Sequence, residues 1–80
     1  MSKKLLKVLN DSKVSFDAKG LYSTIDYYYN LGVTSMLKKD LLNTCSDSER
    51  VFDSALDELV EHGYVLVNNN YIEIIGGKNE

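Results

Sequence analysis

The sequence predicts an α+β domain in which three helices precede a C-terminal β-hairpin. Apolar residues recur at helical spacing in two long segments, one over Phe16–Asn30 and one that ends near His62. After Gly63 the apolar period falls to two, which is typical of strands. The 80 residues include no proline, so Gly, Asn, Asp and Ser must make the turns that separate these segments.

The first long helix is expected over Phe16–Asn30. Ser15 can cap its N-terminus, and Asp17 places a carboxylate in the first turn, where the helix dipole favours negative charge. Gly32 can adopt the left-handed conformation that ends a helix. One stripe of this helix should be buried, and it contains Leu21, Ile25 and Tyr28.

A short helix and a longer capped helix are expected next. Ser35 should cap the short helix, which ends near Thr44. Ser46 stands three residues before Glu49, and this capping box predicts the start of the third helix, which Gly63 ends. The apolar residues expected to be buried are Met36, Leu37, Leu41 and Leu42 in the short helix and Phe52, Ala55, Leu56, Leu59 and Val60 in the third.

The C-terminal hairpin is predicted from two runs of β-forming residues, Tyr64–Asn68 and Tyr71–Ile75. Asn69 and Asn70 join them, and asparagine tolerates the positive φ angles of a two-residue hairpin turn. Residues 1–9 fit either a helical turn or an extended segment. The resulting order of elements is that of a winged helix-turn-helix, with an unrelated α+β miniprotein as the alternative.

Length and composition bound what the chain can do. We expect one domain over residues 1–75, because 80 residues leave no room for a second core. Residues 76–80 are expected to form a flexible tail. The single cysteine, Cys45, and the single histidine, His62, build no recognisable metal site or catalytic set, so we expect no enzymatic activity, no metal and no cofactor. No apolar stretch is long enough to span a bilayer or to act as a signal peptide, which predicts a cytoplasmic protein without a membrane partner.

Three stretches of the sequence carry a resemblance to a known family. They are Val14-Ser15-Phe16-Asp17-Ala18-Lys19-Gly20-Leu21-Tyr22, the pattern Ala55-Leu56-x-Glu58-Leu59 in the third helix, and Gly63-Tyr64-Val65. Over residues 7–75 the chain is similar to the winged-helix domains of phage and plasmid replication-initiation and replisome-organiser proteins of Gram-positive bacteria. The resemblance implies a winged helix-turn-helix with a role in replication. The chain departs from that family in its third helix, which in the family usually carries several basic residues.

Charge divides the chain into a basic and an acidic part. Residues 1–19 carry five lysines against two aspartates, whereas Ser46–His62 carries six acids against Arg50 alone, a net charge of −5. In a helix-turn-helix the second helix of the motif enters the major groove of DNA, and here that helix is the acidic one. DNA phosphates would repel it, because DNA binding is driven largely by lysine and arginine.

The acidic helix is therefore the candidate partner-binding site. Its outward positions should include Glu49, Asp53, Asp57 and Glu61. Tyr27 on the first helix should add an exposed aromatic side chain, a residue type that is enriched at interfaces. We expect a non-enzymatic accessory protein of phage or plasmid type that regulates or inhibits nucleic-acid-processing machinery. Its partner would be a protein component of replication, transcription or defence machinery.

Two alternatives stay open. An acidic helix face is often only a solvated surface. The other alternative is a DNA-binding transcription or replication regulator that acts as a dimer and uses Lys3, Lys4, Lys7 and Arg50 as nucleic-acid-binding residues. The docking interpretation is also compatible with a homodimer.

Overall fold

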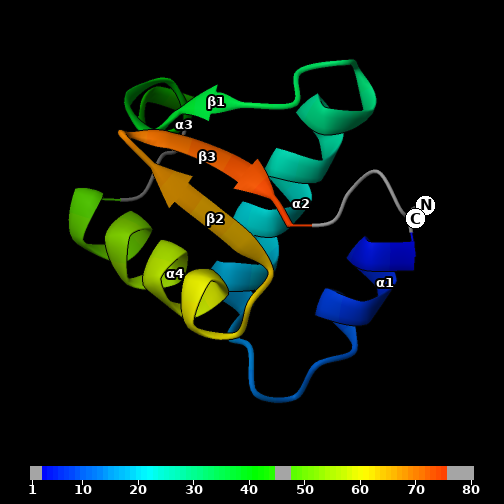
Figure 1. Cartoon of the computed structure of the whole chain (residues 1–80). Coiled ribbons are helices and arrows are strands. Elements are labelled where there is room, and N and C mark those ends of the chain that lie inside the picture. The colour runs from blue at the N-terminus through cyan, green and yellow to red at the C-terminus, as the bar shows by residue number, and fades with distance from the viewer. Residues whose placement is uncertain (1–2, 45–47, 76–80) are drawn as a thin grey trace.

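Helices form the first part of the chain and a small antiparallel sheet closes it, as the sequence predicts (Figure 1). The structure is a computed structural model that describes residues 3–44 and 48–75. Within these ranges no helix has the length and apolar character needed to cross a membrane. The elements in chain order are α1 (Lys3–Leu9), α2 (Phe16–Asn30), β1 (Met36–Leu37), α3 (Lys38–Thr44), α4 (Glu49–Glu61), β2 (Val65–Asn68) and β3 (Tyr71–Ile74).

Helix α2 begins and ends where the sequence predicts. Ser15 has extended backbone angles, and its Oγ accepts a hydrogen bond from the backbone N–H of Ala18 at 3.2 Å. Gly32 follows the helix with a φ of +97°, in the left-handed region. Tyr27 is 61% exposed, as expected, whereas Tyr28 is half-buried against the core.

The sheet contains one strand more than the predicted hairpin. Met36 pairs with Ile72, and Leu37 pairs with Tyr71, so β1 joins the edge of β3. The prediction that these two residues begin a helix capped by Ser35 is wrong, because α3 begins only after them. A strand of two residues is too short to show a period of two, and its partner strand lies more than thirty residues later in the chain.

The hairpin itself is confirmed. Asn69 and Asn70 have φ angles of 51° and 71°, and the two-residue turn that they make joins β2 to β3. The strand order is β1-β3-β2, so β3 lies in the middle of the sheet. Of residues 1–9, which fitted two conformations, Lys3–Leu9 form helix α1, and this helix packs against α2 (Figure 1).

Helix α4 begins later than predicted. Its N-cap is Ser48, whose Oγ accepts a hydrogen bond from the backbone N–H of Val51 at 3.4 Å. The predicted cap, Ser46, lies outside the described residues, as do Cys45 and the tail 76–80. Two serines stand close together before this helix, and the sequence pattern alone favoured the wrong one.

The core lies between α2, α4 and the inner face of the sheet, with α1 covering one side of α2. Val60 was expected in it but is 42% exposed, since it lies at the edge of the buried stripe of α4. The apolar face of α4 therefore points inward and its polar face points to solvent. The buried apolar residues are Val8, Val14, Ala18, Leu21, Tyr22, Ile25, Met36, Leu41, Phe52, Ala55, Leu56, Leu59, Val65, Ile72 and Ile74.

Candidate functional site

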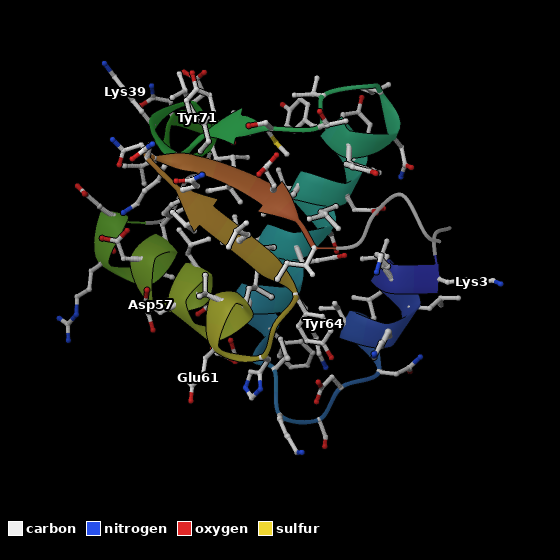
Figure 2. All side chains as sticks on the ribbon, in the orientation of Figure 1. Lys3, Lys39, Asp57, Glu61, Tyr64 and Tyr71 are labelled. Atoms are coloured by element: carbon white, nitrogen blue, oxygen red, sulfur yellow. The ribbon has the colours of Figure 1, made fainter. Side chains whose placement is uncertain are left out.

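The outward side of α4 forms a shallow concave surface, here called the acidic face. Five carboxylates and one guanidinium line it together with Ser54. Figure 2 shows Asp57 and Glu61 on the side of α4 that points away from the sheet. The charged residues that line the acidic face are Glu49, Arg50, Asp53, Asp57, Glu58 and Glu61.

The four acids predicted as partner-binding residues form one row along this helix. They stand four residues apart, and such positions lie about 6 Å apart along the axis on the same side of a helix. The row runs the length of α4 because Phe52, Ala55, Leu56 and Leu59 hold the opposite side in the core. The structure therefore brings Glu49, Asp53, Asp57 and Glu61 onto one surface.

Asp53 differs from the other members of the row, because it forms an ion pair. Its Oδ1 lies 2.9 Å from Nζ of Lys38, the first residue of α3. That oxygen is buried, and the ammonium of Lys38 compensates its charge. The hydrogen bond to Asp53 raises the pKa of Lys38 above its ordinary value. Asp53 thus joins α3 to α4, and its charge is partly neutralised.

Glu58 has a structural role that the sequence did not reveal. Its Oε1 accepts a hydrogen bond from the backbone N–H of Ser15 at 2.6 Å, and its Oε2 accepts one from the Ser15 hydroxyl at 2.8 Å. Glu58 therefore supports the residue that caps α2. The two residues are 43 positions apart, so no local sequence pattern could have predicted the contact.

Tyr27 is not part of the acidic face, whose lining residues all come from α4. Its ring packs edge-to-face on the ring of Tyr28, with 5.3 Å between the centroids. The predicted partner-binding set therefore falls into one row on α4 and one separate exposed tyrosine on α2.

The residues of the DNA-binding alternative are not gathered on one surface. Arg50 lies on the acidic face, at the start of α4. Lys4 and Lys7 line a cavity with His62, which is at the other end of α4, about 18 Å along the axis from Arg50. Lys3 points away from α1 into solvent (Figure 2).

Comparison with known protein families, with curated proteins and with solved structures finds no match to this chain. Among residues 3–44 and 48–75, no group of three or more His, Cys, Asp or Glu side chains is placed to hold a metal ion. The candidate site is therefore defined by the geometry and charge of α4 itself.

Proposed function

We propose that this chain is a winged-helix protein that docks the acidic face of α4 on a basic surface of a protein partner. The order of elements supports the winged-helix assignment, because from α2 onward a helix, a short strand, two helices and a hairpin follow one another. The position of β3 between β1 and β2 supports it as well. In this architecture α4 stands where DNA-binding proteins place their recognition helix.

The observation that carries the proposal is the charge of the acidic face. Glu49, Asp57 and Glu61 are exposed, and among the residues that the structure describes Arg50 is the one base that lines the surface with them. A surface with charge of one sign attracts a partner of opposite sign and accelerates the encounter. The same charge repels the phosphates of DNA.

The partner that fits this surface is a protein whose own nucleic-acid-binding groove is basic. Such grooves occur in replication, transcription and defence proteins, and they hold lysine and arginine in position for phosphates. An acidic helix that occupies the groove competes with nucleic acid, which regulates or inhibits the partner. The chain would then act as a non-enzymatic accessory protein, as the resemblance to phage and plasmid proteins also suggests.

A DNA-binding regulator is the second candidate function. The winged-helix order of elements and the lysines of α1 favour it. Against it, strands β2 and β3 include no lysine or arginine. Helix α4 also presents carboxylates where a DNA-recognition helix needs lysine and arginine side chains. Function depends on the site and not on the fold, and the charge of α4 supports protein docking more than DNA binding.

The proposal is tested with the double variant Asp57→Lys and Glu61→Lys. Asp53 stays unchanged, because replacing it would also break its ion pair with Lys38. The partner is first captured with the wild-type chain from the host lysate, identified, and purified for kinetic measurements. The double variant should then associate at least about tenfold more slowly at low salt, and this difference should shrink as salt increases.

A matched control carries the same change of charge elsewhere. Asp40→Lys with Glu73→Lys alters α3 and β3, and neither residue lines the acidic face. This control should keep the wild-type association rate to within about twofold, apart from the general effect of net charge. Equal association rates for the wild type and the Asp57→Lys, Glu61→Lys variant would contradict docking through α4.

A further inference from the structure

A groove lies between α2 and α4, beside the acidic face. Its volume is about 490 Å³, and residues of both helices line it. Phe16, Gly20 and Thr24 form the α2 side, and because they are four positions apart they lie in one row along that helix. Phe52 and Ala55 belong to the α4 side. The described residues that line the groove are all different from those that line the acidic face.

The aromatic ring of Phe16 is exposed at one end of this groove. It is 89% accessible, more than any other large apolar side chain in the part of the chain that the structure describes. An aromatic ring stabilises a fold by being buried, so the fold gains little from this one. The backbone of Phe16 is nevertheless fixed, because it is the first residue of α2 and follows the cap residue Ser15, which Glu58 binds. A large apolar ring on a fixed backbone is typical of the anchor residues of protein interfaces.

The fold does not require the glycine at position 20. Gly20 stands in the interior of α2, where glycine is less favourable than alanine because it loses more conformational freedom on folding. A Cβ at this position would meet no atom of another described element within 4 Å, and the backbone of Gly20 lies outside the left-handed region. A helix surface without a side chain allows another backbone to approach closely. The glycine therefore fits an occupant of the groove better than it fits the packing of the chain.

Negative charge borders the groove at its Phe16 end. Glu58 lines the acidic face and also binds the residue before Phe16. Asp17 adds an exposed carboxylate to the lining of the groove itself. The ammonium of Lys19 lies 5.7 Å from the centroid of the Phe16 ring, but Lys19 does not line the groove. An occupant at this end therefore meets an apolar ring together with the carboxylates of Asp17 and α4.

The length of this end of the groove sets the size of its occupant. From Phe16 to Thr24 helix α2 rises about 12 Å, which is two turns and the length of about eight helical residues. Tyr28 and Thr44 line the opposite end, and Tyr28 is about 18 Å from Phe16 along α2. The row of Phe16, Gly20 and Thr24 is therefore long enough to contact two turns of another helix.

We infer that this groove binds a basic amphipathic helix of the protein partner. The inference rests on the proposed docking of the acidic face, and it names the part of the partner that binds beside that face. Amphipathic helices bind in grooves through apolar side chains spaced three and four residues apart. The partner helix packs closely over Gly20 and covers the ring of Phe16. Its lysine and arginine side chains then point toward the carboxylates of α4, which have the opposite charge.

Two synthetic peptides of equal charge test the inference. The first is a helical peptide of about 15 residues that contains only leucine and lysine, with leucine at positions i, i+3, i+4 and i+7. The second is an oligolysine, which lacks the apolar side. Fluorescence anisotropy of the labelled peptides should show that the wild-type protein binds the leucine-lysine helix at least about tenfold more tightly than the oligolysine.

Two variants of the groove should weaken this binding for different reasons. Phe16→Ala should weaken binding of the leucine-lysine helix by about tenfold, as the loss of an interface anchor does, and should leave oligolysine binding unchanged. Gly20→Ala should also weaken it, although its urea denaturation midpoint should rise because alanine favours a helix. Tyr27→Ala is the matched control, since it removes an exposed aromatic ring of α2 that does not line the groove. Both of its peptide affinities should equal those of the wild type.

The outcomes separate this inference from the proposed function. Wild-type affinity of Phe16→Ala and Gly20→Ala for the leucine-lysine helix would overturn the inference, as would equal binding of the two peptides by the wild type. The Asp57→Lys, Glu61→Lys variant should lose affinity for both peptides. If it does so while Phe16→Ala and Gly20→Ala bind normally, the groove is not a docking site but the acidic face still is. If it binds oligolysine as well as the wild type does, the docking of the acidic face is itself contradicted.

Discussion

The hydrogen bond between Tyr64 and Asp11 connects two residues that are 53 positions apart in the chain. It joins the residue before β2 to the loop that precedes α2. The Tyr64 hydroxyl, followed by the backbone N–H of Lys13, lowers the pKa of Asp11 below its ordinary value of 3.8. The same bond, together with burial, raises the pKa of Tyr64 from 10.0 to about 12. The bond therefore holds the hairpin to the helical part of the chain when Asp11 is deprotonated and the Tyr64 hydroxyl is protonated.

The variant Tyr64→Phe should lose stability in a way that depends on pH. Asp11 has a depressed pKa, so its contribution is present above pH 3.8 and disappears as pH falls through the lower folded value. Tyr64 has a raised pKa, so its contribution is present below pH 10.0 and disappears as pH rises toward about 12. Urea denaturation of both proteins should give a lower midpoint for the variant at neutral pH and a smaller difference in strong acid.

Tyr71→Phe provides the control, because Tyr71 is exposed on β3 and 45% of its surface is accessible. Its midpoint should follow that of the wild type at every pH. A difference between Tyr64→Phe and the wild type that stays constant down to about pH 2 would mean that Asp11 does not hold the hydroxyl as described.

At the scale of elements, one pair of residues couples α4 to the start of α2. Glu58 binds both the amide and the hydroxyl of Ser15, and that hydroxyl in turn accepts a hydrogen bond from the N–H of Ala18. The cap of α2 is therefore oriented by a side chain from another helix. Such a charged acceptor forms stronger bonds than a neutral one.

A double-mutant cycle with Ser15→Ala and Glu58→Gln should show this coupling. Loss of the serine cap should cost about 0.5–2 kcal/mol of unfolding free energy. The two changes should not add, and their interaction energy should be about 0.5–3 kcal/mol, as for residues in one hydrogen-bond network. Glu61→Gln, one turn further along α4, should change stability by less than about 0.5 kcal/mol. Additive effects of Ser15→Ala and Glu58→Gln would show that α4 does not support the cap.

The elements that the sequence predicted well are those with local causes. Ser15 and Gly32 bound α2, and the pair Asn69-Asn70 makes the hairpin turn, because caps and positive φ angles depend on a few neighbouring residues. Strand β1 was missed because two residues carry no period and their partners come late in the chain. The start of α4 was misplaced because the sequence contains two candidate caps.

The part of the candidate site that depends on local sequence was predicted, and the part that depends on tertiary packing was not. The row on α4 follows from helical spacing, so Asp57 and Glu61 lie where the sequence places them. The ion pair of Asp53 with Lys38 depends on how α3 packs against α4, which spacing cannot reveal. The separation of Tyr27 from the row is likewise a consequence of tertiary packing.

On the scale of the whole molecule, opposite charges occupy different parts of the fold. The acidic face covers the outward side of α4, whereas α1 contributes three lysines and no acid. The electrostatic field of these separated charges orients the molecule as it approaches a charged partner, and this effect weakens as salt is added. The net charge of −3 means that the acidic side dominates at a distance. The central claim is therefore that α4 meets a protein and not DNA.

The most direct test is the binding of wild-type protein to duplex DNA at about 150 mM salt, measured by fluorescence anisotropy over a library of sequences. Non-specific DNA-binding proteins bind duplexes at about 10⁻⁴–10⁻⁶ M under these conditions. The account predicts binding weaker than this range for every sequence, because the exposed acids of α4 repel the phosphates. A sequence-specific complex of nanomolar affinity that is weakened by Arg50→Ala would contradict the account, since α4 would then read DNA.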